Sequence, residues 1–325
     1  MASKINDEFL RNQALILKDP YSQKGLIWEI PNSAVLLDII NIYKFERWPT
    51  EKVYCCLCKG RHHKMGFTAL LASGERLLLG SKCGAKLFRE SWTEAATRME
   101  ERADRQYELI KLDRLDLIAR PFRESLLGWL RAMETILNRR IAFENRLGEL
   151  ASRTREAANN HGGALTVSRR IENKAARAAG LRDLGDHVDV KVGDLSGSAF
   201  FNRFNPKRAV EQALNAFDKM RLGIGDTDNA WTSVLTKRRR DFERTFSDLE
   251  QAAQMYEGAQ EFFSLENFRV LLDWSNKHRA TVARYEIGSD GIVKDEEKAG
   301  GIMLLTLAPL DETPLDLLKE YRRAD

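Results

Sequence analysis

All four cysteines of this 325-residue chain lie within one short stretch, between positions 55 and 83. Cys55 and Cys58 form a Cys-x-x-Cys pair, and Cys83 follows in the sequence GSKCGAKLF. A tetrahedral zinc ion takes four sulfur or nitrogen ligands, and a Cys-x-x-Cys turn supplies two of them because both sulfurs face the same side. The spacing therefore predicts one small zinc-binding module over residues 51–90, rather than a set of disulfides.

A histidine is expected to complete the ligand set. His62 and His63 follow the Cys-x-x-Cys turn, and neighbours in an extended segment point to opposite sides, so only one of them is expected to bind. His63 is preferred, and His62 is the alternate. Cys56 is expected to point away as a small buried residue, although a set that uses Cys56 with Cys58 stays open. The three expected thiolate ligands are Cys55, Cys58 and Cys83.

The sequence around Cys83 predicts how the second half of the module folds. Gly80 and Ser81 are expected to begin a helix whose first turn, with its free N–H groups, favours the thiolate form of Cys83. The stretch MGFTALLASGERLLLG predicts a β-hairpin that turns at Ser73 and Gly74. Four protein ligands leave no open position for water, so the single predicted zinc ion is structural.

The stretch YCCLCKGRHHKMGF, followed by RLLLGSKCGAKLF, resembles the small one-zinc modules of treble-clef or zinc-ribbon type in many phage and mobile-element proteins. The resemblance covers residues 51–90 only. The beginning of the stretch is also similar to the retroviral-type zinc knuckle, whose last cysteine would fall at Thr68. The chain departs from the knuckle pattern there, which speaks against the short-knuckle mode of RNA recognition.

Outside the module, apolar residues recur every three or four positions, which predicts long amphipathic helices. These stripes cover residues 92–120, 126–150 and 226–263, and the second has coiled-coil-like spacing. Pro121 is expected to break or kink the run between the first two. We therefore expect a mainly α, α+β protein in which long antiparallel helices form a bundle or coiled-coil body, with a β-hairpin near the C-terminus.

Four segments are expected along the chain. They are an N-terminal α/β segment (1–50), the zinc-binding module (51–90), the long-helix body (91–285, with an irregular excursion near 183–206), and a C-terminal hairpin with a short helix (286–325). Shorter helices are expected at residues 34–45, after the turn at Pro31, and at 164–182, where the sequence is basic.

Composition and motifs narrow the class of function. The chain is 43% hydrophobic and 31% charged, with a net charge of +4. It has no apolar run long enough to span a bilayer and no signal-peptide core at MASKINDEFLRN, so we expect a cytoplasmic protein without membrane contact. Phosphate-binding loops, nucleophile elbows and His-Glu-x-x-His motifs are missing, so no enzymatic activity and no small-molecule substrate are inferred.

Basic residues are candidate contacts to nucleic acid. Phe200, Phe201 and Phe204 are interleaved with some of them and either stack on bases or, as we prefer, pack into the core. In the run Lys237–Arg240, Arg238 lies near an apolar stripe and is expected to pair with a carboxylate. The candidate nucleic-acid contacts are Lys59, Arg61, Lys64, Arg169, Arg170, Arg203, Lys207 and Arg208.

These patterns favour a zinc-stabilised, non-catalytic nucleic-acid-binding protein, an accessory or regulatory factor of a phage or mobile element. The alternative is a protein-interaction or assembly factor with a protein partner or as a homodimer, since long amphipathic helices commonly form such interfaces. A third hypothesis is a His-His metal-dependent nuclease built on His62 and His63. It lacks an acidic residue just before the pair and a later Asn or His on a well-placed helix to complete the site.

Overall fold

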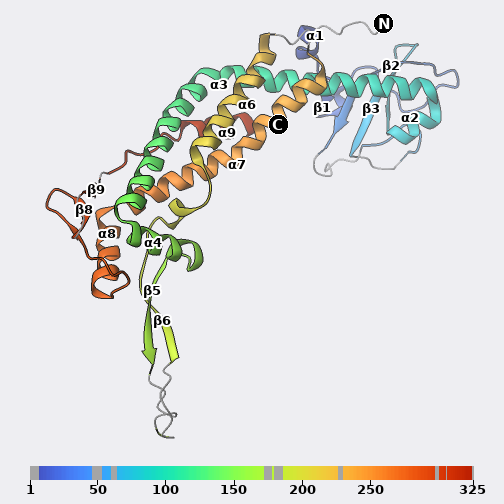
Figure 1. Cartoon of the computed structure of the whole chain (residues 1–325). Coiled ribbons are helices and arrows are strands. Elements are labelled where there is room, and N and C mark those ends of the chain that lie inside the picture. The colour runs from blue at the N-terminus through green and yellow to red at the C-terminus, as the bar shows by residue number, and fades with distance from the viewer. Residues whose placement is uncertain are drawn as a thin grey trace. The chain divides into compact units, whose positions relative to one another are not determined.

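The computed structural model describes residues 7–45, 53–59, 64–171, 178, 186–225, 230–296, 300–304 and 306–323. By its internal contacts the chain divides into two compact units. The first unit comprises residues 1–117 and 219–240, and the second comprises residues 118–218 and 241–325. Helices make up most of the structure and the strands form small sheets, so the expected mainly α, α+β class is confirmed (Figure 1).

The first unit contains a four-stranded sheet in the order β1-β2-β3-β4. β1 pairs in parallel with β2, and the remaining pairs are antiparallel. The predicted hairpin is present as β3 and β4, and Gly74 in its turn has a φ of 87°, a left-handed conformation that glycine adopts without strain. The strands are β1 (Ile16–Leu17), β2 (Leu36–Lys44), β3 (Met65–Leu71) and β4 (Arg76–Leu79).

The helix predicted over residues 34–45 is wrong, because this segment forms strand β2. Two register shifts interrupt the pairing of β2 with β3, one between Leu36 and Asp38 and one between Ile39 and Asn41. Each bulge changes the alternation of inward and outward side chains. Ile39 and Ile42, three residues apart, are consequently both buried, and this spacing imitates a helical stripe.

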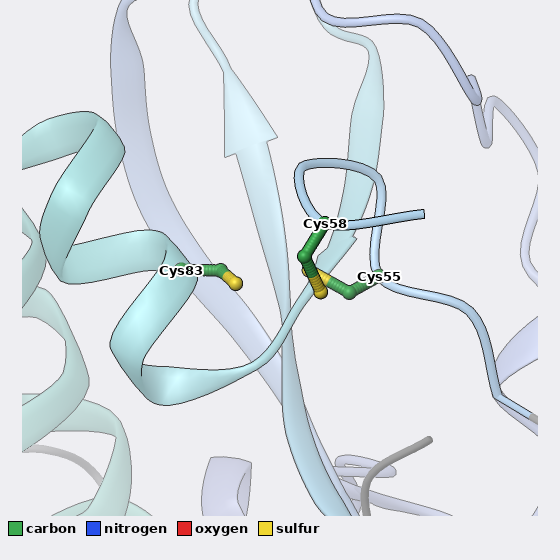
Figure 2. A group of neighbouring side chains, drawn as sticks. All are labelled: Cys55, Cys58 and Cys83. Carbon is green, nitrogen blue, oxygen red and sulfur yellow. The ribbon is translucent and has the colours of Figure 1, made fainter. Parts of the chain in front are cut away.

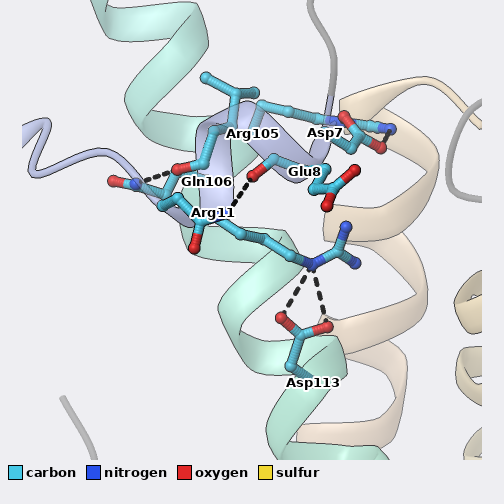
Figure 3. Close-up of polar contacts among 8 residues, drawn as sticks. Asp7, Glu8, Arg11, Arg105, Gln106 and Asp113 are labelled. Atoms are coloured by element: carbon cyan, nitrogen blue, oxygen red, sulfur yellow. Dashed lines mark hydrogen bonds and ion pairs between the residues drawn. The ribbon is translucent and has the colours of Figure 1, made fainter.

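Charged contacts hold helix α1 (Asp7–Arg11) on helix α3 (Glu90–Arg146) in the first unit (Figure 3). The guanidinium of Arg105 lies 2.6 Å from the carboxylate of Asp7, and both side chains are largely buried. The guanidinium of Arg11 lies 2.9 Å from the carboxylate of Asp113, which is about two helical turns beyond Arg105 on α3. The amide of Gln106 donates to two backbone carbonyls at the end of α1, which fixes the entry of the chain into β1.

Helix α3 runs through Pro121 without interruption, so the break predicted there does not occur. A proline inside a helix removes one backbone donor and leaves the carbonyl four residues earlier without its partner. Here that carbonyl belongs to Leu117, whose side chain is 83% exposed, and Pro121 is exposed as well. Water can therefore hydrate the carbonyl, which lowers the cost of keeping the helix continuous.

Aromatic rings from four helices meet in the core of the second unit. Phe122 of α3 lies 5.2 Å from Phe217 of α6 (Pro206–Gly225) and 5.8 Å from Phe242 of α7 (Thr232–Phe262), measured between ring centroids. Tyr321 of α9 (Thr313–Arg323) adds an edge-to-face contact to Phe242 at 5.9 Å. Such pairs stabilise a core beyond their buried area, so these rings set how the helices pack.

The second unit also contains two small sheets. β5 (Ala164–Ile171) and β6 (Asp186–Asp194) form an antiparallel ribbon, so the basic helix predicted from residue 164 is wrong over 164–171. The strand forms because its partner is supplied from residues 186–194, and a local pattern does not reveal that pairing. Most of residues 172–185 lie outside the described chain. The predicted C-terminal hairpin is a three-stranded meander of β7 (Tyr285–Ile287), β8 (Ile292–Asp295) and β9 (Gly301–Met303).

The shorter helices of the second unit connect these elements. Helix α8 (Leu265–Leu272) continues directly into a π-helical turn, η3 (Asp273–Lys277). α4 (Gly148–Asn160) precedes β5, and the short 3-10 turn η2 (Ser198–Phe201) follows β6. No helix among the described residues is both long enough and apolar enough to cross a bilayer.

Candidate metal centre

Three cysteine side chains converge in the first unit. The Sγ atoms of Cys55, Cys58 and Cys83 all lie within 4.8 Å of one another. Figure 2 shows the two sulfurs of the Cys-x-x-Cys turn directed toward Cys83, which projects from helix α2 (Ser81–Phe88). Within the described part of the chain this is the one group of histidine, cysteine and carboxylate side chains close enough to share a metal ion.

Backbone hydrogen bonds shape the turn that carries Cys55 and Cys58. The N–H of Lys59 donates to the carbonyl of Cys55 at 3.1 Å and closes the turn. The N–H of Cys56 donates to the carbonyl of Leu78 at 2.9 Å and ties the turn to strand β4. The sheet therefore positions the turn that carries the two sulfurs.

Cys83 lies in the first turn of α2, as the sequence predicts. Gly80 has an extended backbone at the N-cap, and the N–H groups of Cys83 and Gly84 both donate to its carbonyl, at 3.0 and 2.9 Å. Gly84 is buried against the indole of Trp92, which stacks on Phe88 and meets Phe67 edge-on. This packing fixes the orientation of α2, and thereby the direction of the Cys83 side chain.

Cys56 does not belong to the cluster. Its thiol is 4% exposed and donates to the backbone carbonyl of Ile27 at 3.3 Å. This placement confirms the expectation of a small buried residue and disfavours the ligand set that uses Cys56 with Cys58. Burial raises the pKa of the Cys56 thiol, which keeps it protonated and unreactive.

The donor set fits a metal ion of the zinc type. Burial, followed by the neighbouring thiols of Cys55 and Cys58, raises the pKa of Cys83 to about 12 when no cation balances the sulfurs. A bound cation removes this penalty, because a coordinating thiol loses its proton outright. Tetrahedral zinc–sulfur bonds of about 2.3 Å place sulfurs about 3.8 Å apart. This separation is compatible with three sulfurs that all lie within 4.8 Å of one another.

The predicted fourth ligand, His63 with His62 as the alternate, lies outside the described residues, as does Arg61. Lys59 and Lys64, which flank that segment, are both exposed. On the ribbon, Arg169 and Arg170 of β5 are exposed as well. Arg203 and Arg208 are exposed, whereas Lys207 pairs with Glu134 at 3.0 Å, and this contact holds the pKa of Lys207 above its usual range.

The stretch that contains Phe200 and Phe201 and the basic run Lys237–Arg240 each bury some of their side chains. Phe200 and Phe201 are completely buried, as we preferred, and pack on Phe262. In the run Lys237–Arg240 the buried pair is formed by Arg239, not by Arg238, and its partner is Glu108 at 2.9 Å. The residue of α7 that pairs with a carboxylate is therefore one position later than predicted.

Sequence reasoning missed Arg89 as a candidate contact. Lys82 and Lys86 are one helical turn apart on α2, and Arg89 follows at the C-cap, so the helix that carries Cys83 also carries or adjoins three exposed cations. The spacing of three and four residues in the sequence was the available signal. No protein-family model, curated protein or solved structure matches this chain.

Proposed function

We propose that this protein is a zinc-stabilised, non-catalytic nucleic-acid-binding protein. One zinc ion is held by Cys55, Cys58 and Cys83, with His63 or alternatively His62 as the fourth ligand. A closed shell of four protein ligands stabilises the fold and leaves no position for a reacting water. None of the four cysteines forms a disulfide bond, which suits a compartment that keeps thiols reduced, as the cytoplasm does. The resemblance of the module favours an accessory or regulatory role in a phage or mobile element.

The distribution of charge around the cluster carries the proposal. Between residues 53 and 89 a single carboxylate, Glu75, stands against seven basic residues. Among the described residues, Lys59, Lys82, Lys86 and Arg89 form no ion pair with a carboxylate, and all four are exposed. Phosphates attract such a surface irrespective of base sequence. The seven residues are Lys59, Arg61, Lys64, Arg76, Lys82, Lys86 and Arg89.

Two of these cations occupy backbone conformations that favour glycine. Lys59 has a φ of 28° and Arg89 a φ of 54°. A side chain at positive φ costs free energy, and such strain is retained mostly where the residue has a function. Neither side chain contributes to the core. Lys59 directly follows Cys58, and Arg89 ends the helix that carries Cys83, so their charges support a role in binding phosphates.

The distribution of charge between the two units is consistent with a nucleic-acid surface in the first unit. Lysines and arginines outnumber acids in the first unit, whereas acids outnumber bases in the second. The ring contacts among α3, α6, α7 and α9 support a helical bundle as the body of the protein. A nucleic-acid surface limited to the first unit accounts for the modest net charge of the whole chain.

The test measures binding of a fluorescently labelled DNA duplex, and of an RNA of the same sequence, at increasing salt. Replacing Lys82, Lys86 and Arg89 with glutamine is expected to weaken binding at least tenfold at low salt. The slope of log affinity against log salt should fall by about 2 to 3, because each phosphate contact releases roughly one counterion.

The matched control replaces three cations that already pair with acids, namely Arg244, Lys277 and Lys319. This control carries the same change of charge and is expected to retain both affinity and slope. Equal losses in both triple variants would contradict a specific surface around the metal site. Failure of the wild type to bind either probe at low salt would overturn the proposed function.

A second candidate function, a protein-interaction or assembly factor, is favoured by exposed apolar side chains in the first unit. Leu117, Leu222 and Trp231 are 83%, 68% and 80% exposed. Sedimentation of wild type and of Trp231→Ser distinguishes the two functions. A self-association that the variant abolishes, without any retention on nucleic acid, would favour the alternative.

A further inference from the structure

Three hollows surround the π-helical turn η3 in the second unit. Their volumes are about 660, 500 and 330 Å³. Asp273 lines the first and second, whereas Trp274 and His278 line the second and third. π-helical turns are rare and frequently occur at functional sites. A turn of this kind, with residues that line three hollows, is a candidate binding site.

The third hollow gathers donor groups from several elements. It is lined by Arg153 of α4, by His161, and by His278 and Arg279, which follow η3. Among the described residues, the side chains of His161, His278 and Arg279 have no hydrogen-bonding or ionic partner. Three side chains that line one hollow, carry hydrogen-bond donors and have no protein partner can bind an external oxyanion.

The backbone at Arg279 supports the same conclusion. His278 is the C-cap of the turn, and Arg279 follows it with a φ of 54°. Helix ends usually place glycine at this position, because a side chain there strains the backbone. The N–H of Ala280 donates to the carbonyl of Trp274 at 3.4 Å, which closes the end as a glycine motif would. An arginine at such a position indicates a use for its side chain beyond the fold.

Neighbouring contacts hold the strained segment in place. The carboxylate of Glu149 accepts hydrogen bonds from the N–H groups of Val282, at 3.0 and 3.1 Å, and of Ala283, at 3.2 Å. The amide of Asn276 exchanges two hydrogen bonds with the backbone of Tyr285, at 2.6 and 3.1 Å. The chain is thus fixed on both sides of Arg279, and the hollow is formed before any ligand arrives.

We propose that the hollow of about 330 Å³ binds a small phosphomonoester that also carries hydroxyl groups. The planar guanidinium of Arg279 matches two phosphate oxygens, and the imidazoles of His161 and His278 supply further donors. The cavity size falls within the range of small-ligand sites.

The two acids in the lining are compatible with this ligand. Glu156 lies 3.3 Å from the guanidinium of Arg153, and this ion pair balances its charge. Asp189 of β6 is left as an acceptor, which suits a hydroxyl of the ligand rather than its phosphate. The site lies in the second unit, and its proposed ligand is independent of the nucleic-acid surface around the cysteines.

Isothermal titration calorimetry of the full chain with ribose 5-phosphate, inorganic phosphate and ribose tests the proposal. We expect saturable binding of ribose 5-phosphate with a dissociation constant below about 1 mM, weaker binding of phosphate, and none of ribose. Absence of saturable binding of both phosphate-bearing probes at millimolar concentration would overturn it.

Arg279→Gly is the decisive variant, because glycine relieves the backbone while removing the guanidinium. It is expected to keep or raise the Tm and to weaken binding of ribose 5-phosphate at least tenfold. His161→Gln, which leaves that backbone unchanged, should also weaken binding. The control is Arg284→Gln, an exposed arginine nearby that lines none of the three hollows, and it should bind normally. Unchanged affinity in Arg279→Gly would overturn the proposal.

Discussion

Trp92 packs directly on Gly84, so closely that any side chain at position 84 would overlap with the indole ring. Gly84 follows Cys83 on α2, and Trp92 lies on α3, so this contact joins the cysteine cluster to the longest helix. The ring is 1% exposed and is enclosed by Phe67 and Phe88, which leaves it no room to move. The geometry of the cysteine cluster therefore depends on a residue that binds no metal.

Gly84→Ala is predicted to destabilise the protein by about 1–3 kcal/mol, because the added methyl group overpacks a filled core. Gly128→Ala is the control, since it also lies in a helix but has no neighbouring atom within 4 Å. Alanine there should stabilise the protein by up to about 1 kcal/mol through its higher helix propensity. Thermal unfolding of both variants checks the pair, and a neutral Gly84→Ala would refute the packing argument.

The ion pair between Arg239 and Glu108 is almost completely buried, and the hydroxyl of Thr236 donates to the same carboxylate at 2.9 Å. Glu108→Ala is predicted to cost about 3–5 kcal/mol, because it leaves a buried guanidinium without its counter-ion. Lys237→Ala, at an exposed position in the same basic run, should change the free energy of unfolding by less than about 0.5 kcal/mol. Urea titrations measure both, and similar values for the two variants would contradict the assignment.

Asp311 contributes to stability in a pH-dependent way. Hydrogen bonds from the hydroxyls of Thr313 and Ser125 lower the pKa of its carboxyl group. Because the pKa is lower in the folded state, the contribution is present above the ordinary pKa of an aspartate and is lost as pH falls through the folded value. Asp311→Asn is therefore expected to lower Tm at neutral pH, and the difference from wild type should shrink below about pH 4. A difference that stays constant down to pH 3, roughly a unit below the ordinary value, would contradict this.

Arg89 is predicted to lower the stability of the fold and to strengthen binding of nucleic acid. Its φ of 54° and ψ of −125° belong to a region in which glycine is strongly preferred. Arg89→Gly should therefore leave Tm unchanged or raise it, and should weaken binding to the labelled duplex. Arg98→Gln, on the first turns of α3 and already near Asp38, serves as the control and should bind normally. A lower Tm with unchanged affinity would show that Arg89 has only a structural role.

The local features of the metal site could be predicted from the sequence. The Cys-x-x-Cys turn, the helix start at Cys83 and the burial of Cys56 each depend on a few consecutive residues. Most of helix α3 was predicted as well, because its apolar residues recur every three or four positions. Its continuity through Pro121 was not, because it depends on the exposure of a carbonyl group that the sequence pattern does not encode.

Features that depend on distant partners could not be predicted in this way. β2 resembles a helix because two bulges in its pairing with β3 bury residues three apart. β5 forms only because β6 pairs with it from the far side of a long connection. Arg239 rather than Arg238 faces Glu108 because the phase of α7 is set by packing on α3. The left-handed backbone conformations of Arg89 and Arg279 have no signature in the sequence.

Metal analysis of three purified proteins tests the central claim most directly. Wild type and Cys56→Ser are predicted to contain one zinc ion per chain, because the thiol of Cys56 lies outside the cluster. Cys83→Ser is predicted to lose the metal and, since metal binding contributes folding free energy, to unfold at a lower temperature. Wild type without stoichiometric zinc, or full zinc content in Cys83→Ser, would contradict the account.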